Sequence, residues 1–334
     1  MAGTMRAVVS YEGRPIDDRD SLRDEEIPIP GLRPRDVLVR VQAVSVNPVD
    51  VKVRAGLTRS PEPRVLGFDA AGVVEAVGPE VGTLAVGDEV WYAGDITRPG
   101  ANAEMHAVDE RIVARKPRSL TFAEAAAMPL TTITAWETLF DHFRLTTEST
   151  GALLVLGGAG GVGSMTIQLA KRLTGVTVLA SASRPESTAW VRTLGADHVV
   201  DHRELAAGTR ASAPGGIDFL LSPHTRGNIE VYAEIMRPFG HITAIDEPEG
   251  LELLPLKSKS VTWHWEFMFT RPLHQTPDMI EQKRLLERAA ALVDDARIRT
   301  TLTTTIDDFS AAGIREAHRL VESGRMIGKL VVTR

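Results

Sequence analysis

The sequence of 334 residues predicts an α/β fold that combines a β-rich domain with a doubly wound parallel sheet. Short apolar or alternating runs, separated by clusters of Pro, Gly and Asp, indicate the β-rich part over the first 125 residues. Strands that alternate with helices between residues 153 and 245 indicate the parallel sheet. A glycine-rich turn at the start of this alternation is the most informative single feature.

The elements expected along the chain follow from these patterns. In the β-rich part we expect strands at Met5–Val9, Val37–Val46, Gly72–Val77, Glu89–Tyr92 and Ala103–Val108, and helix from Thr121 onward. In the alternating part we expect strands at Leu153–Leu156, Val176–Ala180, His198–Val200, Ile217–Leu221 and His241–Ile245, with helices near Glu186–Leu194 and Asn228–Met236. Beyond an aromatic strand at Val261–Phe267 come a helix (Met279–Val293), a strand (Thr300–Ile306), a helix (Ser310–Glu322) and a strand (Lys329–Val332).

The glycine turn has the spacing of a dinucleotide-binding loop. Gly158, Gly160 and Gly163 fill the pattern GxGxxG between an apolar strand and a helix. Such glycines allow a tight turn, let the backbone approach a pyrophosphate and let the helix pack closely on the strand. The first N–H groups of the helix, around Gly161 and Val162, then face negative charge, so we expect this loop to bind a dinucleotide.

The end of the second strand predicts which dinucleotide is bound. It carries Ser181, Ala182, Ser183 and Arg184, with no Asp or Glu to accept hydrogen bonds from the ribose 2′-OH of NADH. A guanidinium and two hydroxyls suit a 2′-phosphate instead, which favours NADPH. The alternative is that these residues form a solvated turn before Pro185.

Composition and charge exclude several classes of function. A net charge of −6 with both signs mixed along the chain gives no attraction toward nucleic acids or anionic membranes. The sequence has neither an apolar run long enough to span a membrane nor the apolar core of a signal peptide, so we expect a cytoplasmic protein. It contains no cysteine and no HExxH motif, so we expect no metal site.

Several further segments together resemble a known family. The sequence is similar to the medium-chain dehydrogenase/reductase superfamily, and within it to the zinc-free quinone oxidoreductase branch that includes zeta-crystallin. The matching segments are VSVNPVDVKVRAG (44–56), LGFDAAGVVEAVG (66–78), VGDEVW (86–91), AMPLTTITAWETL (127–139), the glycine loop, LGADHVVDHRE (194–204) and GRMIGKLVV (324–332). The resemblance implies a GroES-like catalytic domain, residues 1–126 and 268–334, around a Rossmann domain, residues 127–267.

The resemblance also bears on metal binding. Zinc alcohol dehydrogenases of this superfamily hold the catalytic zinc with a Cys in the first matching segment and a His in the motif GHE. The corresponding residues here are Asn47 and Phe68, of which the first is a poor ligand and the second cannot ligate. The cysteine-rich lobe that carries a structural zinc is missing as well. We therefore expect chemistry without zinc.

Catalytic and nicotinamide contacts are implied by the same resemblance. Asn47 is expected at the nicotinamide end of the cleft, unless it only caps a turn before Pro48. Asp50 is expected to orient Asn47 or its loop. Thr131 is expected to contact the nicotinamide, with Thr132 as the substitute if the register is shifted by one.

Further cofactor contacts are expected at the carboxyl edge of the sheet and at two more positions. His202 falls near the expected 2′-phosphate and could equally be a surface residue. The segments Ser222–Thr225 and Ile245–Glu247 follow two strands at the edge where open α/β sheets bind ligands. Lys329 resembles a position close to the cofactor cleft, and is otherwise an ordinary lysine at a strand end.

The aromatic segment 261–272 is typical of a strand core or a subunit interface. The resemblance implies that the segment also forms part of the substrate cleft. His264 is the one acid–base group in it, so it is a candidate proton donor. The Tyr that many relatives carry shortly after NPxD is missing from residues 53–60, and we expect Tyr92 to be packed.

Together these features predict an NADPH-dependent reductase of quinones or α,β-unsaturated carbonyls that works as a homodimer. Without a Lewis acid an alcohol is hard to oxidise, whereas a conjugated acceptor forms a delocalised oxyanion that modest hydrogen bonding stabilises. The alternatives are a reductase of small aldehydes and an NADPH-binding redox sensor or structural or RNA-binding relative with little turnover. The charge balance speaks against RNA.

Overall fold

The computed structural model describes residues 3–334 and divides them into two compact units. Unit 1 contains the chain up to Leu130 and again from Phe269 to Arg334, and unit 2 contains Thr131–Met268. The first unit is therefore built from both ends of the chain. No helix among the described residues combines the length and apolarity needed to cross a bilayer.

Unit 1 is rich in β-structure, as predicted. Its strands are β1 (Thr4–Ser10), β2 (Arg23–Pro28), β3 (Asp36–Ser45), β4 (Arg64–Val65), β5 (Asp69–Val77), β6 (Glu89–Ala93), β7 (Met105–Asp109), β8 (Val113–Arg115), β15 (Leu302–Ile306) and β16 (Lys329–Thr333). Its helices are η1 (Arg19–Ser21), α1 (Pro48–Ala55), η2 (Glu110–Ile112), α2 (Phe122–Ala126), α8 (Thr270–His274), α9 (Ile280–Asp294) and α10 (Ala311–Glu322).

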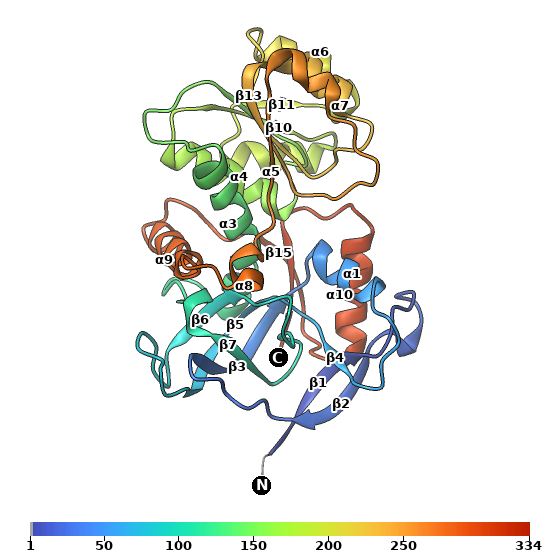
Figure 1. Ribbon diagram of the computed structural model, residues 1–334, viewed down its shortest axis with the longest axis vertical. Helices are drawn as coiled ribbons and strands as arrows, with labels where there is room; N and C mark the ends of the chain where they lie inside the picture. The colour runs from blue at the N-terminus through green and yellow to red at the C-terminus, as the bar shows by residue number, and fades with distance from the viewer. Residues whose placement is uncertain (1–2) are drawn as a thin grey trace. The chain divides into compact units, whose positions relative to one another are not determined.

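Two sheets organise unit 1. One has the strand order β2-β1-β4, and the other has the order β15-β16-β3-β5-β6-β8, with β7 paired to β3. Apolar residues that alternate along β3, such as Val37, Val39 and Val41, are fully buried in the core between sheet and helices. Helices α1 and α10, far apart in the sequence, contact each other, as Figure 1 shows.

The register of three neighbouring strands determines where the functional candidates of unit 1 lie. Ser45, the last residue of β3, pairs with Asp69 at the start of β5 and with Val331 in β16. The chain leaves β3 toward Asn47 at the same edge at which β5 and β16 begin. Asn47, Asp69 and Lys329 are thereby gathered from three distant parts of the sequence.

Unit 2 contains the predicted doubly wound sheet. Its strands are β9 (Ala152–Val155), β10 (Thr177–Ser181), β11 (His198–Val200), β12 (Ile217–Ser222), β13 (Met236–Ala244) and β14 (Thr262–Trp265). Its helices are α3 (Pro129–Trp136, which begins in unit 1), η3 (Glu137–His142), α4 (Gly161–Leu173), α5 (Pro185–Leu194), η4 (His202–Glu204), α6 (Leu205–Ser212), α7 (Ile229–Ile235) and η5 (Leu254–Lys259).

All strand pairs of this sheet are parallel, and their order is β11-β10-β9-β12-β13-β14. The order reverses beside β9, so the glycine loop that follows β9 lies at the switch point where such sheets bind dinucleotides. Helix α4 contacts α5, and α6 contacts α7, as two helix pairs around the sheet (Figure 1). The α/β fold class with a β-rich domain and a Rossmann-like domain is confirmed.

The clearest difference from the predicted elements is α1. No helix was expected at Asn47 and Pro48, where a capped turn was the alternative to a functional role, but an eight-residue helix begins there. Pro48 occupies the first helical position, where its missing N–H costs nothing, and the Asp50 carboxylate accepts a hydrogen bond from the Asn47 N–H. The turn signal was therefore the beginning of a helix.

Candidate active site

A buried polar cluster lies at the strand edge of unit 1. It consists of Asn47, Asp50, Asp69 and Lys329, whose exposed fractions are 1%, 0%, 0% and 5%. Buried groups of this kind are costly unless each finds a partner, so their contacts decide what the cluster can do.

Lys329 is the central donor of the cluster. Its ammonium donates to the carbonyl oxygen of Val46 at 3.0 Å and to Oδ1 of Asn47 at 2.6 Å, and it lies 3.5 Å from Oδ2 of Asp69. Two of the three ammonium hydrogens are donated in hydrogen bonds, and Asp69 lies within ion-pair distance. Lys329 is thus held inside unit 1.

Asn47 links the lysine to a carboxylate. Its Nδ2 donates to Oδ2 of Asp69 at 2.8 Å and lies 3.5 Å from the carbonyl oxygen of Ser45. The other carboxylate oxygen of Asp69 accepts from the backbone N–H of Leu130 at 2.7 Å. The Asn47 carboxamide is therefore held on both sides.

Burial shifts the ionisation of all three charged members. It raises the pKa of Asp50 to about 7, although the Asn47 N–H and the Lys329 ammonium favour the charged form. It also raises the pKa of Asp69 and lowers that of Lys329, because desolvation outweighs their mutual attraction. With two carboxylates and one ammonium, the cluster is one positive charge short of neutrality, which favours a proton on Asp50 near neutral pH.

The side chains present do not fit a zinc site. Phe68 is 2% exposed, and its ring packs edge to face on Phe269 with centroids 4.9 Å apart. The ammonium of Lys329 binds the one oxygen that Asn47 could offer a metal. Within residues 3–334, no group of three or more His, Asp or Glu side chains is arranged to hold a metal ion. The donor set lacks the nitrogen and sulfur ligands that zinc prefers.

The glycine loop of unit 2 is packed too tightly for side chains. A Cβ on Gly163 would lie 2.5 Å from the carbonyl oxygen of Gly157, and one on Gly158 would lie 2.8 Å from the Cβ of Ala180. The left-handed residue of the turn is Gly157, with φ of 62°, rather than a glycine of the GxGxxG pattern. Gly160 caps α4, whose first turn contains Gly161, Val162 and Gly163. The loop and the helix start fit a pyrophosphate.

The residues expected to read the 2′-phosphate lie at the end of β10. The hydroxyl of Ser181 accepts a hydrogen bond from the N–H of Gly157 at 2.8 Å, so it braces the glycine loop. Ser183 is exposed, Arg184 is half-buried and precedes α5, and His202 is exposed at the start of η4. A guanidinium and a hydroxyl beside the loop suit a phosphate ester.

Three other expected cofactor contacts are less open to a ligand. The Ser222 hydroxyl is fully buried and lies 2.7 Å from the hydroxyl of Tyr232. Ile245 donates its N–H to the carbonyl oxygen of Ser222 at 3.0 Å and is half-buried. Thr131 is 2% exposed near the start of α3. Of these, Ile245 leaves most surface at the carboxyl edge of the sheet.

His264 belongs to a cluster of imidazoles in unit 2. Its Nε2 lies 3.1 Å from Nδ1 of His241, and the two rings are stacked. The ring of His142 is 5.2 Å away, and His142 contacts Glu266 at 2.8 Å. Burial lowers the pKa of His264 to about 4, and any charge on the neighbouring imidazoles lowers it further, so its ring is neutral at physiological pH.

Asp69 is the functional residue that sequence reasoning missed. As the first residue of a mainly apolar strand, it carried no sign of its partners. The signal that could have found it is its position in LGFD, directly after Phe68 in the segment that matches the motif GHE. Tyr92 is fully buried in unit 1, as expected, and its hydroxyl lies 3.0 Å from Nδ1 of His106.

A GroES-like β-rich unit together with a Rossmann-like unit defines the NAD(P)-dependent dehydrogenases and reductases. Residues 33–130 match the family described as alcohol dehydrogenase GroES-like domain, and residues 194–332 match the family described as zinc-binding dehydrogenase. The chain belongs to the medium-chain dehydrogenase/reductase superfamily, and it is an oxidoreductase with an NAD(P)-binding fold.

Individual relatives agree with this assignment. A zinc-type alcohol dehydrogenase-like protein of Staphylococcus aureus (strain COL) is 43% identical over 89% of this chain and 90% of its own length. A crystal structure from Rhizobium etli CFN 42, described as a candidate zinc-dependent alcohol dehydrogenase, is 48% identical and covers 100% of this chain and 99% of its own, with a TM-score of 0.96. The chloroplastic NADPH-dependent alkenal/one oxidoreductase of Arabidopsis thaliana is 42% identical over 54% of this chain and 48% of its own length.

Proposed function

We propose that this protein is an NADPH-dependent, zinc-independent reductase that transfers hydride to a quinone or an α,β-unsaturated carbonyl. The observation that carries the proposal is the contact between Lys329 and Asn47: a lysine ammonium binds the side chain that corresponds to a zinc ligand in the zinc enzymes. A site with a resident ammonium and a phenyl ring in place of zinc ligands suits acceptors that need no Lewis acid.

Within this proposal the two units have separate tasks. Unit 2 (Thr131–Met268), close to the expected range 127–267, binds the cofactor, and unit 1, close to the expected ranges 1–126 and 268–334, forms the catalytic domain. The N–H groups of the glycine loop bind the pyrophosphate, while Ser183 and Arg184, with His202 when protonated, bind the 2′-phosphate. Thr131, Ser222, Ile245 and Lys329 complete the surroundings of the cofactor. NADPH supplies the hydride when it is bound.

Asn47 is proposed to bind the acceptor oxygen, and Asp50 to hold the loop that carries it. The short hydrogen bond from the Asn47 N–H to Asp50 supports the second role. Because burial raises the pKa of Asp50 to about 7, we propose that its carboxyl group is partly protonated at neutral pH. Because its pKa is lowered to about 4, His264 remains a candidate proton donor only in acidic solution, and unchanged turnover in His264→Ala would remove it from the mechanism.

The name of the Arabidopsis relative supports an alkenal or alkenone as acceptor and NADPH as donor. The names of the staphylococcal and rhizobial proteins refer to zinc, in contrast to the donor set of unit 1. Ligand chemistry decides whether zinc is held, and it is the donor set that supports the zinc-independent proposal.

A homodimer is proposed through strand β14. This strand lies at one edge of the sheet, and Trp265 and Phe267 beside it are 52% and 44% exposed. An open strand edge with exposed aromatic side chains is a surface that a second copy of the chain could pair with and cover.

The deciding experiment is an assay of NADPH oxidation with 9,10-phenanthrenequinone, 1,4-benzoquinone and a panel of enals, with simple aldehydes and NADH as comparisons. We expect turnover of conjugated acceptors with NADPH, unchanged by chelators, and no zinc in metal analysis of the pure protein. Zinc that leaves together with activity would refute the metal-free site. Cofactor binding without turnover of any acceptor would instead favour a redox sensor.

A further inference from the structure

The Asn47 carboxamide is held in one orientation by a pair of opposite charges. Lys329 donates to its oxygen, and its nitrogen donates to Asp69. Turning the amide over would place its NH₂ against the ammonium and its oxygen against the carboxylate. Both contacts would be repulsive in a place where water cannot screen them, so the ion pair permits one orientation only.

This orientation leaves one donor weakly engaged. Nδ2 of Asn47 carries two hydrogens, of which one is donated to Asp69 at 2.8 Å. The acceptor recorded for the other is the carbonyl oxygen of Ser45 at 3.5 Å, which is at the limit of a hydrogen bond. The Lys329 ammonium makes its two closest contacts within the cluster, to the carbonyl oxygen of Val46 at 3.0 Å and to Oδ1 of Asn47 at 2.6 Å, so we expect it to act through Asn47.

We propose that Asp69 and Lys329 are positioning residues for hydride transfer, because their ion pair fixes Asn47 so that its second Nδ2–H is donated to the acceptor's carbonyl oxygen. This inference rests on the function proposed above. For an enone, the hydride of the reduced nicotinamide forms a C–H bond at the β-carbon, and the C=C electrons move to give an enolate oxygen. Water then supplies the proton, and the nicotinamide is oxidised by two electrons. A donor already oriented toward that oxygen stabilises the charge as it develops.

Three variants separate positioning from stability: Lys329→Met, Asp69→Asn and the double variant. Each single change leaves a buried charge without its partner and should destabilise unit 1, whereas the double change removes both charges. We expect kcat/KM for the acceptor to fall about 100-fold in all three. Stability against urea should recover in the double variant while kcat/KM does not. If kcat/KM recovers together with stability, the ion pair is only structural and the proposal is wrong.

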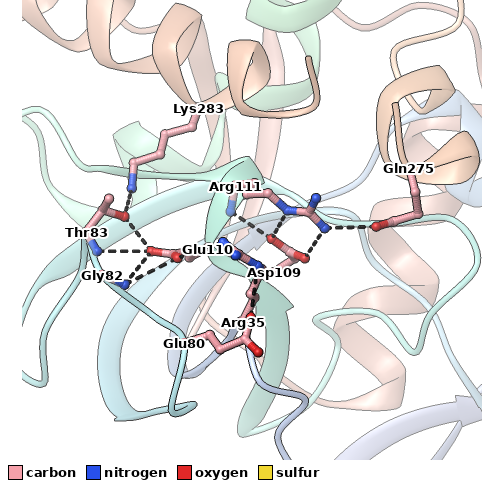
Figure 2. A network of polar contacts seen from close by, with 9 residues as sticks. All are labelled: Arg35, Glu80, Gly82, Thr83, Asp109, Glu110, Arg111, Gln275 and Lys283. Atoms are coloured by element: carbon pink, nitrogen blue, oxygen red, sulfur yellow. Dashed lines mark hydrogen bonds and ion pairs between the residues drawn. The ribbon is translucent and has the colours of Figure 1, made fainter. Parts of the chain in front are cut away.

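Lys283→Met is the matched control. Lys283 is 4% exposed against 5% for Lys329, and both lie in unit 1. Its ammonium donates to the hydroxyl of Thr83 in a separate network around Glu110, shown in Figure 2. We expect this variant to lose stability and to keep the kinetic constants of the wild type. A loss of kcat/KM as large as that of Lys329→Met would show that any buried lysine of the unit has this effect.

Side-chain amide NMR tests the orientation without any turnover. The sequence has three asparagines, Asn47, Asn102 and Asn228, so protein labelled with ¹⁵N-asparagine gives three side-chain amide pairs, and Asn47→Ser identifies one of them. We expect both hydrogens of the Asn47 pair to lie away from the positions of an unrestrained asparagine amide in the wild type, and to move toward those positions in the double variant. Identical spectra would refute the fixed orientation. If no quinone or enone is turned over, the proposed function fails while this measurement still decides the orientation.

Discussion

His318 makes the stability of unit 1 depend on pH in a way that one substitution removes. It lies in α10 with no exposed surface, and neither ring nitrogen has a hydrogen-bond partner among residues 3–334. Burial lowers its pKa from 6.5 to about 3, with a smaller contribution from the charge of Arg54. The folded state therefore holds a neutral ring across a range in which the unfolded chain is protonated.

The sign and size of the effect follow from proton linkage. Because the folded pKa is depressed, stability is complete above pH 6.5 and falls as the pH drops toward 3. Between pH 7.5 and pH 5 the unfolded chain gains about 2 kcal/mol from protonation of this one group, taking its unfolded pKa as about 6.5.

The substitution His318→Leu isolates this contribution. Urea unfolding of the wild type and the variant at pH 7.5 and pH 5, with hydrogen exchange of α10 as a local readout, gives the difference between the two proteins at each pH. We expect the variant to be at least as stable at pH 7.5, because the unpaired ring nitrogens are gone, and to gain about 2 kcal/mol relative to the wild type at pH 5. The same loss of stability in both proteins between the two pH values would refute the assignment to His318.

Three further predictions concern the cofactor and the dimer. Arg184→Ala should raise the KM for NADPH about 10- to 100-fold, as expected when one or two charge-assisted hydrogen bonds are lost, and leave that for NADH unchanged; equal changes for both cofactors would contradict the 2′-phosphate contact. Gly163→Ala should abolish NADPH binding in a fluorescence titration and cost about 1–3 kcal/mol in urea, because the new Cβ would meet the Gly157 carbonyl oxygen at 2.5 Å. Gly215→Ala, whose Cβ would have open space, is its control, and binding retained in both variants would argue against the tight loop. Trp265→Glu should convert a dimer into a monomer in sedimentation analysis, since a buried carboxylate at the β14 edge would be unpaired; an unaltered mass would place the interface elsewhere.

The sequence was most informative where a feature is local. The glycine loop, the strands of the parallel sheet and the β-rich domain were predicted because each depends on spacing or periodicity within a few residues. Even there, the spacing did not show that the left-handed residue is Gly157 or that Gly158 packs against Ala180. A pattern of glycines shows that a tight loop exists, while the backbone path decides what each one does.

The buried cluster was only partly predictable because it depends on strand register. Asn47 and Lys329 were selected one by one from matching segments, and their contact across 282 positions is not visible in either segment. Asp69 was missed because it becomes a partner only when β5 begins opposite the end of β3. The helix after Asn47 was missed because Asn-Pro signals a turn as readily as a helix start.

The members of the buried cluster are also synthesised at very different times. The ribosome makes Asn47, Asp50 and Asp69 first, then the whole of unit 2, and only afterwards the strand β16 that brings Lys329 to Ser45. Until then the growing chain carries two carboxylates without their counter-ion and a β3 edge without its neighbour. A nascent chain can thus complete unit 2 before unit 1. The buried cluster, to which we assign the chemistry, is then the part of the protein that is completed last.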